Sequence, residues 1–281
     1  MSDFATFRIP ATTANLGPGY DCLGVALQVY NHVTVRRVEG GEPGEMAGRA
    51  AALFFETSGT AAFPFGWEIE GQVPRSRGLG SSVTVRLGLL HGLNALAGAP
   101  LDATKLFELC AQLEGHPDNA APAAFGGFTV AGGPKIARFE VAPELKFVLL
   151  IPNFEISTPE ARKALPPQLD RLSAVASCAG ACRITAAFAA QDYEMLRGAF
   201  ADGLHQPFRQ KLIPILPEVI AAGEAAGALG GFLSGSGSTI CCVTLREAEA
   251  VAAAMLKAAG GGAATTVITE ADNAGVRAGQ N

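Results

Sequence analysis

Hydrophobic and polar positions follow two different periods along this chain, which predicts a protein that mixes helices and strands. Strand-like runs, in which β-branched and apolar residues cluster or alternate with polar ones, cover residues 25–38, 67–73, 147–152, 238–245 and 265–269. Alanine- and leucine-rich stretches with helical spacing cover residues 82–97, 102–114, 169–190, 217–226 and 246–259. The expected fold class therefore mixes α-helices and β-strands.

Two domains are expected, because 281 residues can bury more than one core. Neither a long linker nor an internal repeat divides the sequence. Pro152 and Asn153 interrupt the strand-like pattern. The predicted division is an N-terminal domain over 1–152 and a C-terminal domain over 153–281.

Composition and charge exclude several classes of protein. With 49% hydrophobic and 17% charged residues, the chain is expected to be globular. A formal net charge of −5 predicts no broad basic surface, so nucleic acid is not an expected partner. No apolar run reaches the roughly 18 residues of a membrane span, and residues 1–4 lack the features of a signal peptide. A cytoplasmic protein without a membrane segment is expected.

The six cysteines are expected to be reduced and mostly buried, because a chain of this size needs no disulfide framework. Cys178 and Cys182 lie four residues apart on a predicted helix. Neither a histidine nor a second cysteine pair stands at ligand spacing, so a metal site there is not expected.

The turn G-L-G-S-S at residues 78–82 opens directly onto a predicted helix. The first N–H groups of a helix have no partner within it and the helix dipole is positive there, so such a turn can bind phosphate. Ser81 and Ser82 add hydroxyls that can cap the helix or bind Mg²⁺. An ordinary helix cap has the same sequence, so the turn alone leaves both interpretations open.

The helix predicted over 102–114 ends in a second candidate group, and Asp102 is suited to cap its start. Glu114 falls on the apolar face of this helix, so its carboxylate is expected to point inward and to need a positive partner. A metal ion would supply one. Alternatively, the helix frays before Gly115 and the carboxylate reaches water. The polar run H-P-D-N at 116–119 follows directly.

Two common nucleotide-binding signatures are absent from the sequence. The chain has no G-x-x-x-x-G-K-S/T loop, which disfavours a Walker-type nucleotidase. The G-S-G run at 235–237 is followed by a strand-like run instead of a helix, which disfavours a Rossmann dehydrogenase.

The N-terminal run P-A-T-T-A-N-L-G-P-G-Y-D contains a tight glycine-proline turn between Asn15 and Asp21. Taken with the other motifs, it strongly resembles the homoserine kinases of the GHMP kinase superfamily. The residues that carry the resemblance are 10–21, 78–82, 114–119 and 233–239, with further agreement at 157–162 and 205–214. It spans the chain from residue 9 to about residue 269.

This resemblance implies a two-domain α+β fold of the GHMP kinase type, with an N-terminal domain like domain 2 of ribosomal protein S5 and a ferredoxin-like C-terminal domain. The implied reaction moves the γ-phosphoryl group of ATP to the side-chain hydroxyl of L-homoserine, with Mg²⁺ as cofactor. Homodimers are usual in the family, so a homodimer is expected.

Roles for individual residues follow from the resemblance. The implied ATP-binding residues are Pro74, Arg77, Gly78, Leu79, Gly80, Ser81, Ser82, Gly235, Ser236 and Gly237. Ser82 and Glu114 would bind Mg²⁺. The implied substrate-binding residues are Asn15, Asp21, His116, Asp118, Arg162 and Arg209, with Asp21 suited to the substrate ammonium and the two arginines to its carboxylate and the phosphate.

Catalysis is assigned by the same resemblance to Asn119, Arg162 and Arg209. Asn119 stands where some relatives have a catalytic aspartate, and an amide cannot accept a proton as a carboxylate can. Direct attack helped by positioning and charge neutralisation is therefore expected.

Two departures from the family pattern bear on these expectations. Residues 38–67 are shorter than usual, in a region that commonly contacts adenine, so nucleotide preference stays open. Ser238 stands where relatives commonly have proline, a change expected to be tolerated. Two other functions stay open as well: a GHMP kinase for another small alcohol, and a noncatalytic homologue that binds a metabolite.

Overall fold

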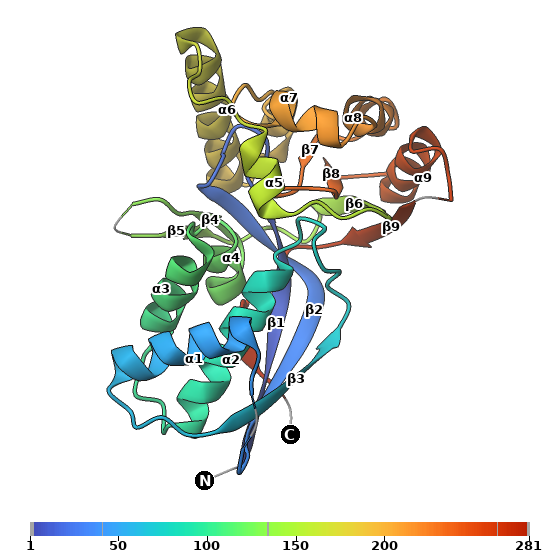
Figure 1. Ribbon diagram of the computed structural model, residues 1–281. Coiled ribbons are helices and arrows are strands. Elements are labelled where there is room, and N and C mark those ends of the chain that lie inside the picture. The colour runs from blue at the N-terminus through green and yellow to red at the C-terminus, as the bar shows by residue number, and fades with distance from the viewer. Residues whose placement is uncertain (1–2, 41, 134, 263, 280–281) are drawn as a thin grey trace.

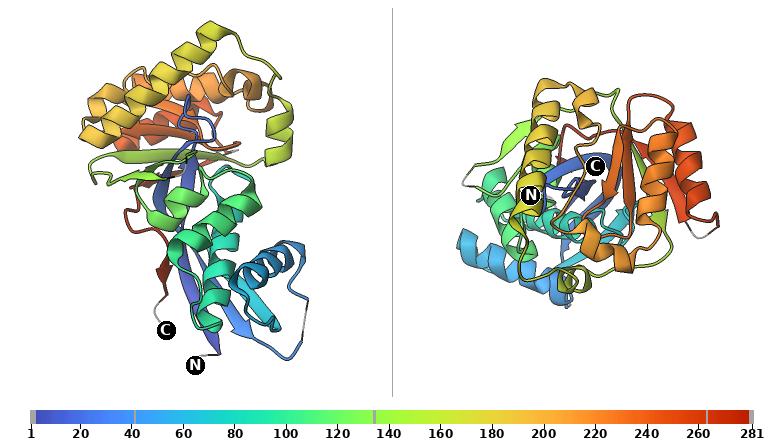
Figure 2. Two further views of the ribbon diagram at one scale, coloured as in Figure 1. Left: turned by 90° about the vertical axis from the view of Figure 1, so that its left-hand side faces the viewer. Right: turned by 90° about the horizontal axis from the view of Figure 1, so that it is seen from above.

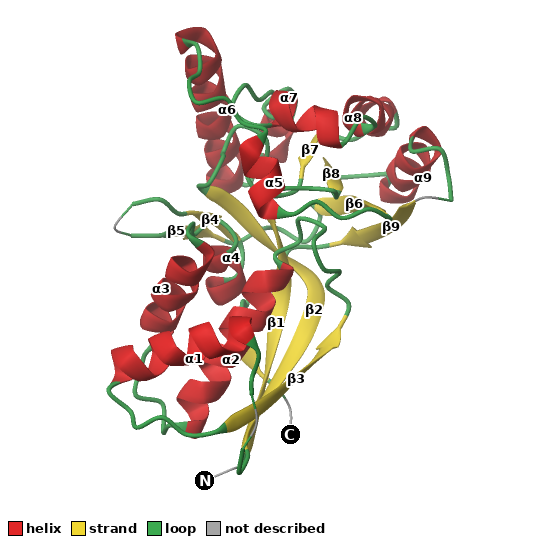
Figure 3. Ribbon diagram, viewed as in Figure 1, coloured by secondary structure: helices red, strands yellow, loops and turns green. Residues whose placement is uncertain are grey.

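The computed structural model describes residues 3–40, 42–133, 135–262 and 264–279. The chain forms two β-sheets with helices packed against each of them (Figures 1 and 3). Both are antiparallel throughout the described strand pairs.

The first sheet has the strand order β10-β1-β2-β4-β5, and β3 also pairs with β2. Its strands are β1 (Phe4–Ala14), β2 (Leu23–Arg37), β3 (Phe65–Gly71), β4 (Phe128–Val130), β5 (Ala137–Phe139) and β10 (Arg277–Ala278). Helices α2 and α4 pack on β1 and β2, and α1 and α3 lie beside α2. These helices are α1 (Glu45–Ser58), α2 (Ser81–Leu96), α3 (Ala103–Glu114) and α4 (Ala120–Phe125).

The second sheet has the strand order β7-β8-β6-β9. Its strands are β6 (Lys146–Pro152), β7 (Gly230–Leu233), β8 (Ile240–Thr244) and β9 (Ala264–Thr269). The helical segments of this half are α5 (Thr158–Lys163), α6 (Arg171–Ala190), η1 (Tyr193–Leu196), α7 (Gln206–Arg209), η2 (Gln210–Leu212), α8 (Leu216–Ala225) and α9 (Ala248–Ala258). Figure 2 shows that they cover the side of the second sheet that faces away from the first half of the chain.

Helix α2 lies directly against β2 because two of its glycines leave room for valine side chains. A Cβ atom on Gly88 would lie 2.4 Å from Cβ of Val33, and one on Gly92 would lie 2.4 Å from Cγ2 of Val35. Real Cβ atoms are not found so close to another carbon, so only glycine allows this approach. The close contact holds α2 on the sheet and thereby places the start of the helix at the site described below.

Substituting Gly88 by alanine is expected to destabilise the protein by about 1–3 kcal/mol, because the added methyl group overpacks the contact with Val33. Gly48 in α1 is a matched control, since no atom lies within 4 Å of the position of its Cβ. Gly48→Ala is expected to stabilise the protein by about 0.5–1 kcal/mol. Urea unfolding measures both, and equal effects of the two substitutions would contradict the packing argument.

The predicted strands and helices are all present, with ends shifted by at most a few residues. Two larger elements, β1 and α1, were not predicted. Strand β1 exists through pairing with β2 along its whole length, from Phe4 opposite Arg36 to Ala14 opposite Gly24, which no local pattern records. Helix α1 buries a stripe of small and aromatic residues against α2, namely Ala47, Ala50, Ala51 and Phe54. Their helical spacing is visible in residues 45–58 and could have revealed the helix.

The boundary predicted at residue 152 does not coincide with the passage from one sheet to the other. Strand β6 ends at Pro152 and lies between β8 and β9 in the second sheet, so the chain changes sheets before Lys146. The chain then returns to the first sheet through β10. Strand pairing decides this division, and a proline after a strand does not reveal which sheet the strand joins.

All six cysteines are free, as expected, but they are less buried than predicted. Cys110, Cys241 and Cys242 are buried, whereas Cys178 and Cys182 are exposed on α6. The prediction of burial is wrong for this pair because the described part of the chain leaves the outer side of α6 uncovered.

Candidate active site

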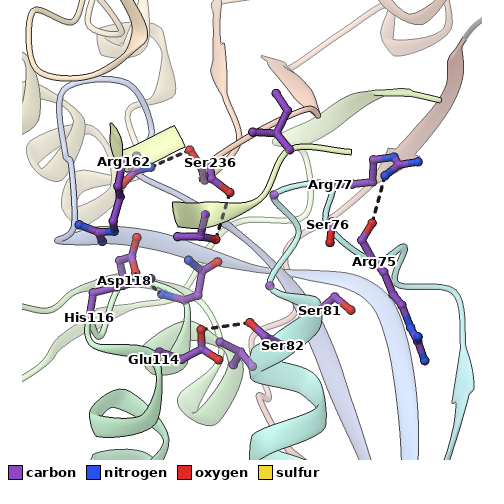
Figure 4. A pocket seen from close by; sticks show the side chains of 18 of the residues that line it. Arg75, Ser76, Arg77, Ser81, Ser82, Glu114, His116, Asp118, Arg162 and Ser236 are labelled. Carbon is purple, nitrogen blue, oxygen red and sulfur yellow. Dashed lines mark hydrogen bonds and ion pairs between the residues drawn. The ribbon is translucent and has the colours of Figure 1, made fainter. Parts of the chain in front are cut away.

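A cavity of about 470 Å³ lies between the glycine-serine turn and the helices of the second half (Figure 4). It is lined by the loop before α2, the start of α2, the segment after α3, helix α5 and the turn between β7 and β8. The sequence-predicted residues that line it are Asn15, Asp21, Arg77, Gly78, Gly80, Ser81, Ser82, Glu114, His116, Asp118, Asn119, Arg162, Arg209, Gly235 and Ser236. Residues from distant parts of the sequence therefore meet in one place.

The glycine-serine turn has the geometry of an anion site. Gly78 and Gly80 both have positive φ, at 71° and 68°, and Gly80 precedes the first helical residue without any side-chain cap. A Cβ on Gly80 would lie 2.1 Å from Oγ1 of Thr12, so the turn must stay free of side chains. No described residue accepts a hydrogen bond from the backbone N–H of Gly80, Ser81 or Ser82. These amides are available to a phosphate group at the helix start.

In the turn at 235–237, the N–H groups of Gly235 and Gly237 already have acceptors. The N–H of Gly235 donates to the carbonyl of Ala14 at 3.1 Å, and the N–H of Gly237 donates to that of Ser234 at 2.9 Å. The Gly235 amide holds the turn against the end of β1 and the Gly237 amide closes the turn on itself, so neither is free to donate to a phosphate group. The hydroxyl of Ser236 lines the cavity and lies 3.5 Å from that of Thr158.

Glu114 points inward, as its helical position predicts, and α3 does not fray before it. The helix continues through Glu114 and ends at Gly115 in the left-handed conformation. Ser82 Oγ donates to Glu114 Oε2 at 3.0 Å (Figure 4). Arg86 Nη1 lies 2.5 Å from Glu114 Oε1. The positive partner predicted for this carboxylate is thus a side chain, Arg86, which the sequence analysis did not identify. Its position four residues after Ser82 places it on the same face of α2 and could have revealed it.

The donor set at Glu114 fits a magnesium ion. Ser82 and Glu114 bring a hydroxyl and a carboxylate oxygen together directly beside the turn that carries the free amides. Mg²⁺ prefers such hard oxygen ligands and is commonly held by one or two protein groups together with phosphate oxygens.

Charged groups gather on the other side of the cavity. Arg162 Nη2 donates to both carboxylate oxygens of Asp21, at 2.9 and 3.1 Å, and its Nη1 donates to the hydroxyl of Tyr20 at 2.9 Å. His116 Nδ1 lies 2.5 Å from Asp118 Oδ1. Ligand atoms of the two aspartates and the histidine lie within 4.8 Å of one another, but Arg162 already compensates one carboxylate and His116 the other.

The pKa of His116 reflects two opposing effects. Burial lowers the pKa of this imidazole, but the hydrogen bond to Asp118 and the charge of that carboxylate outweigh burial, so the pKa is raised above 6.5. The His116–Asp118 pair thus places a positively charged hydrogen-bond donor and a second carboxylate beside Asp21.

Arg209 is a buried cation without an acidic partner in the described part of the chain. The side chain is 2% exposed. Its Nε donates to the carbonyl of Ala161 at 3.2 Å, and its Nη1 donates to that of Gly235 at 3.1 Å and to Nδ1 of His205 at 3.2 Å. Burial lowers the pKa of this guanidinium. A buried, positively charged group that lines a cavity favours an anionic ligand.

His205 holds Arg209 in place as a neutral imidazole. Its Nε2 donates to the carbonyl of Gly17 at 2.8 Å, which leaves Nδ1 as the acceptor for Arg209. Burial lowers the pKa of His205 to about 4, even though the nearby Asp202 carboxylate acts in the opposite direction. The ring therefore stays uncharged at neutral pH.

The pKa of His205 predicts a loss of stability in acid. The unfolded imidazole binds a proton near pH 6.5 and the folded one only near pH 4, so the unfolded state binds more protons between these values. The free energy of unfolding is expected to fall by about 3 kcal/mol as the pH is lowered through this window. His205→Asn, which keeps an acceptor for Arg209, is expected to show a shallower fall in urea unfolding between pH 7 and pH 4. Burial also lowers the pKa of His91 to about 4, so the wild type and His205→Asn both keep the loss of stability that His91 causes. Identical pH profiles of the two proteins would contradict the assignment of the remaining loss to His205.

The two asparagines of the site differ in what they leave free. Asn15 donates from Nδ2 to the carbonyl of Gly235 at 2.9 Å and accepts from the N–H of Asp21 at 3.0 Å, so both ends of its amide hold the fold. Asn119 Oδ1 accepts from Thr12 Oγ1 at 2.7 Å. Its Nδ2 makes no hydrogen bond with a described residue, so it is free to donate into the cavity.

Two family models match the chain. The model described as GHMP kinases N terminal domain matches residues 45–127, and GHMP kinases C terminal matches residues 184–262. The homoserine kinase of Synechococcus sp. is 41% identical over 265 residues, which covers 86% of this chain and 87% of that protein. The homoserine kinase of Clostridium beijerinckii is 39% identical and covers 87% of each chain. This chain belongs to the homoserine kinase family.

Solved structures confirm the expected GHMP kinase fold. The crystal structure of homoserine kinase from Cytophaga hutchinsonii matches with a TM-score of 0.90 at 24% identity and covers 99% of this chain and 98% of that chain. The mevalonate kinase of Methanococcus jannaschii matches with a TM-score of 0.71 at 14% identity, over 94% and 97% of the two chains. The α+β fold is shared with GHMP kinases that carry other names.

Three residues predicted from the homoserine kinase family lie outside the cavity lining, namely Pro74, Leu79 and Gly237. The Leu79 side chain is buried in the core, and its carbonyl accepts from the N–H of Thr12. Leu79 therefore packs the turn at 78–82 against the core, which holds the turn in place while its amides face the cavity.

Proposed function

We propose that this member of the homoserine kinase family transfers the γ-phosphoryl group of ATP to the side-chain hydroxyl of L-homoserine, giving O-phospho-L-homoserine, ADP and the hydroxyl proton, which is released to solvent. The observation that carries the proposal is the meeting of three features in one cavity. These are the unpaired amides at the start of α2, the Ser82–Glu114 oxygen pair, and the buried guanidinium of Arg209.

The triphosphate lies in this proposal along the turn at 78–82, where the amides of Gly80, Ser81 and Ser82 donate to phosphate oxygens. Ser82 and Glu114 hold Mg²⁺, which supplies positive charge that stabilises the phosphates during transfer. The cavity continues to the apolar side chains of Met46 and Trp67, which offer a surface for the nucleotide base. Residues 38–67 would thus contribute to nucleotide binding through Met46 of α1 and Trp67 of β3.

The amino acid lies at the other side of the cavity. Its ammonium group faces Asp21 and Asp118, and its carboxylate faces Arg162. Binding requires the Arg162–Asp21 ion pair to admit the two charged groups of the substrate between its partners. That pair is about one-third exposed on both sides, so it is accessible to such an exchange.

Transfer depends on positioning and charge in this arrangement. Arg209 is held by His205 and Gly235 and stabilises charge on the moving phosphoryl group. Asn119 donates from Nδ2, since Thr12 occupies its oxygen. A loose transition state for phosphoryl transfer needs alignment more than a strong base, so these groups suffice.

The protein acts in this proposal as a homodimer in the cytoplasm, without nucleic acid or membrane as a partner. The net charge of −5, which gives no broad basic surface, supports the absence of nucleic acid as a partner.

A coupled assay for ADP release with homoserine, threonine, mevalonate and pantoate tests the proposal. Homoserine is expected to give the highest kcat/KM. A higher value with another alcohol would assign a different GHMP kinase activity. Tight binding of homoserine without ADP release above background would favour the noncatalytic alternative.

A further inference from the structure

Helix α6 is apolar on its outer side as well as on its inner side. Ile184 and Phe188 are buried in the core, and Phe188 stacks on Phe128 at a centroid distance of 4.2 Å. On the other side, Leu172 and Val175 are 77% and 61% exposed. Figure 2 shows α6 along the outer surface of the second half of the chain. Among the described helices, only α6 has the length and composition to cross a membrane, but its inner face packs in the core.

The exposed apolar residues of α6 form a heptad repeat. Alternate spacings of three and four residues connect Leu172, Val175, Ala179, Cys182, Ala186 and Ala189, and all six are exposed. This spacing is typical of a seam that packs against a second helix. The only charged residues of α6 are Arg171 and Arg183, so the side that faces water lacks the charges of an ordinary surface helix. These six residues are called the α6 seam.

We propose that the α6 seam is covered by the α6 seam of a second copy of this chain, with the two helices antiparallel about a twofold axis. In this register, Leu172 lies opposite Ala189 of the second copy, and Val175 lies opposite its Ala186. Each larger side chain then meets an alanine, and the central layer pairs Ala179 with Cys182. A parallel arrangement would instead place the two leucines together and the two terminal alanines together, which packs unevenly.

Charge at the ends of the helices agrees with the antiparallel register. Arg171 lies beside the seam at the start of α6, and Asp192 lies just past its end. Both are exposed, and neither forms an ion pair with a described residue. The same register that pairs Leu172 with Ala189 brings Arg171 beside Asp192 of the second copy at both ends. A parallel pair would place like charges together there.

A groove beside the seam extends the same surface. It has a volume of about 250 Å³ and is lined by Ala176, Ala179, Arg183 and the segment at 198–201. Small residues on both sides let helices approach closely. This inference gives the proposed homodimer its surface and rests on that part of the proposed function, but not on the kinase activity.

Light scattering after size exclusion, from about 1 to 100 μM, tests the proposal. The wild-type protein is expected to have twice the chain mass of 28.8 kDa. Val175→Glu places a charge opposite an alanine in the seam and is expected to weaken dimerisation by at least a hundredfold. Ala174→Glu is the matched control, since it adds the same charge at an exposed position of α6 outside the seam and is expected to leave the dimer intact.

A mixing experiment tests the antiparallel register. Val175→Glu and Ala186→Lys are each expected to be monomeric, and an equimolar mixture is expected to form a heterodimer. The antiparallel register places Glu at 175 of one chain opposite Lys at 186 of the other, whereas a parallel one does not. The proposal is overturned if the wild type is monomeric at 100 μM, if Val175→Glu remains dimeric, if the control dissociates equally, or if the mixture does not associate.

Two further measurements distinguish a dimer interface from a lipid-binding surface and from the catalytic site. A monomeric wild type that binds vesicles of anionic phospholipid, with binding lost in Val175→Glu, would assign the seam to a lipid surface and overturn the proposal. Phosphorylation of homoserine is measured on every variant. A dimer without kinase activity would contradict the proposed reaction and leave the interface intact.

Discussion

Arg209→Ala is expected to lower kcat for homoserine phosphorylation by about a hundredfold to a thousandfold, because it removes a preorganised cation from a site shielded from water. The side chain is 2% exposed, held by His205 and Gly235, and has no acidic partner within the described ranges of the chain. Its charge is therefore free to stabilise the transferring phosphoryl group. Steady-state kinetics with saturating ATP and homoserine measure the effect.

Stability separates this role from a structural one. A buried charge without a carboxylate partner costs free energy in the folded protein, but Arg209 also donates to the carbonyls of Ala161 and Gly235 and to Nδ1 of His205. Arg209→Met keeps much of the volume, removes the charge and leaves these acceptors unpaired, so the free energy of unfolding is expected to change by no more than about 1–2 kcal/mol. Arg209→Lys keeps the charge but loses the paired donors of the guanidinium, and an intermediate rate is expected. Wild-type turnover in Arg209→Ala, or a large loss of stability in Arg209→Met, would contradict this assignment.

Glu114→Gln is expected to raise the Mg²⁺ concentration that gives half-maximal turnover by at least about tenfold, because it replaces a charged oxygen ligand by a neutral one. It also leaves Arg86 without its carboxylate partner, next to the phosphate site. Activity measured over a Mg²⁺ titration at fixed ATP tests the prediction.

Glu108 offers a matched control on the same helix. It is exposed and pairs with Lys105, far from the Ser82 hydroxyl, so Glu108→Gln is expected to leave the Mg²⁺ dependence unchanged. The metal assignment would be wrong if Glu114→Gln had the same Mg²⁺ dependence as this control.

Several parts of the site could be read from short stretches of sequence. The turn at 78–82 and the helix after it are neighbours in the chain, so their geometry follows from glycine conformations and helix capping. The inward direction of Glu114 follows from helical periodicity, and the cap at Asp102 was predicted and is confirmed, with a hydrogen bond of 2.8 Å to the N–H of Lys105.

Other parts could not be predicted because they depend on which segments meet. Glu114 was expected to need a cation, but only the packing of α2 beside α3 selects Arg86. Arg209 alone would be interpreted as a surface cation, and its burial arises from the turn at 235, helix α5 and His205 around it. The acceptor of the Gly235 amide, the carbonyl of Ala14, likewise lies beside it only because of the fold.

The sequence by itself determined most of the helices and strands, the glycine-serine turn before α2 and the family, since these depend on residues close together or on a long run of motifs in order. Only the tertiary structure decided the partners of the charged groups, the sheet joined by β6 and the exposure of α6. The physical reason is that ion pairing, burial and strand pairing depend on distances between segments far apart in the chain, and local patterns of hydrophobicity do not contain those distances.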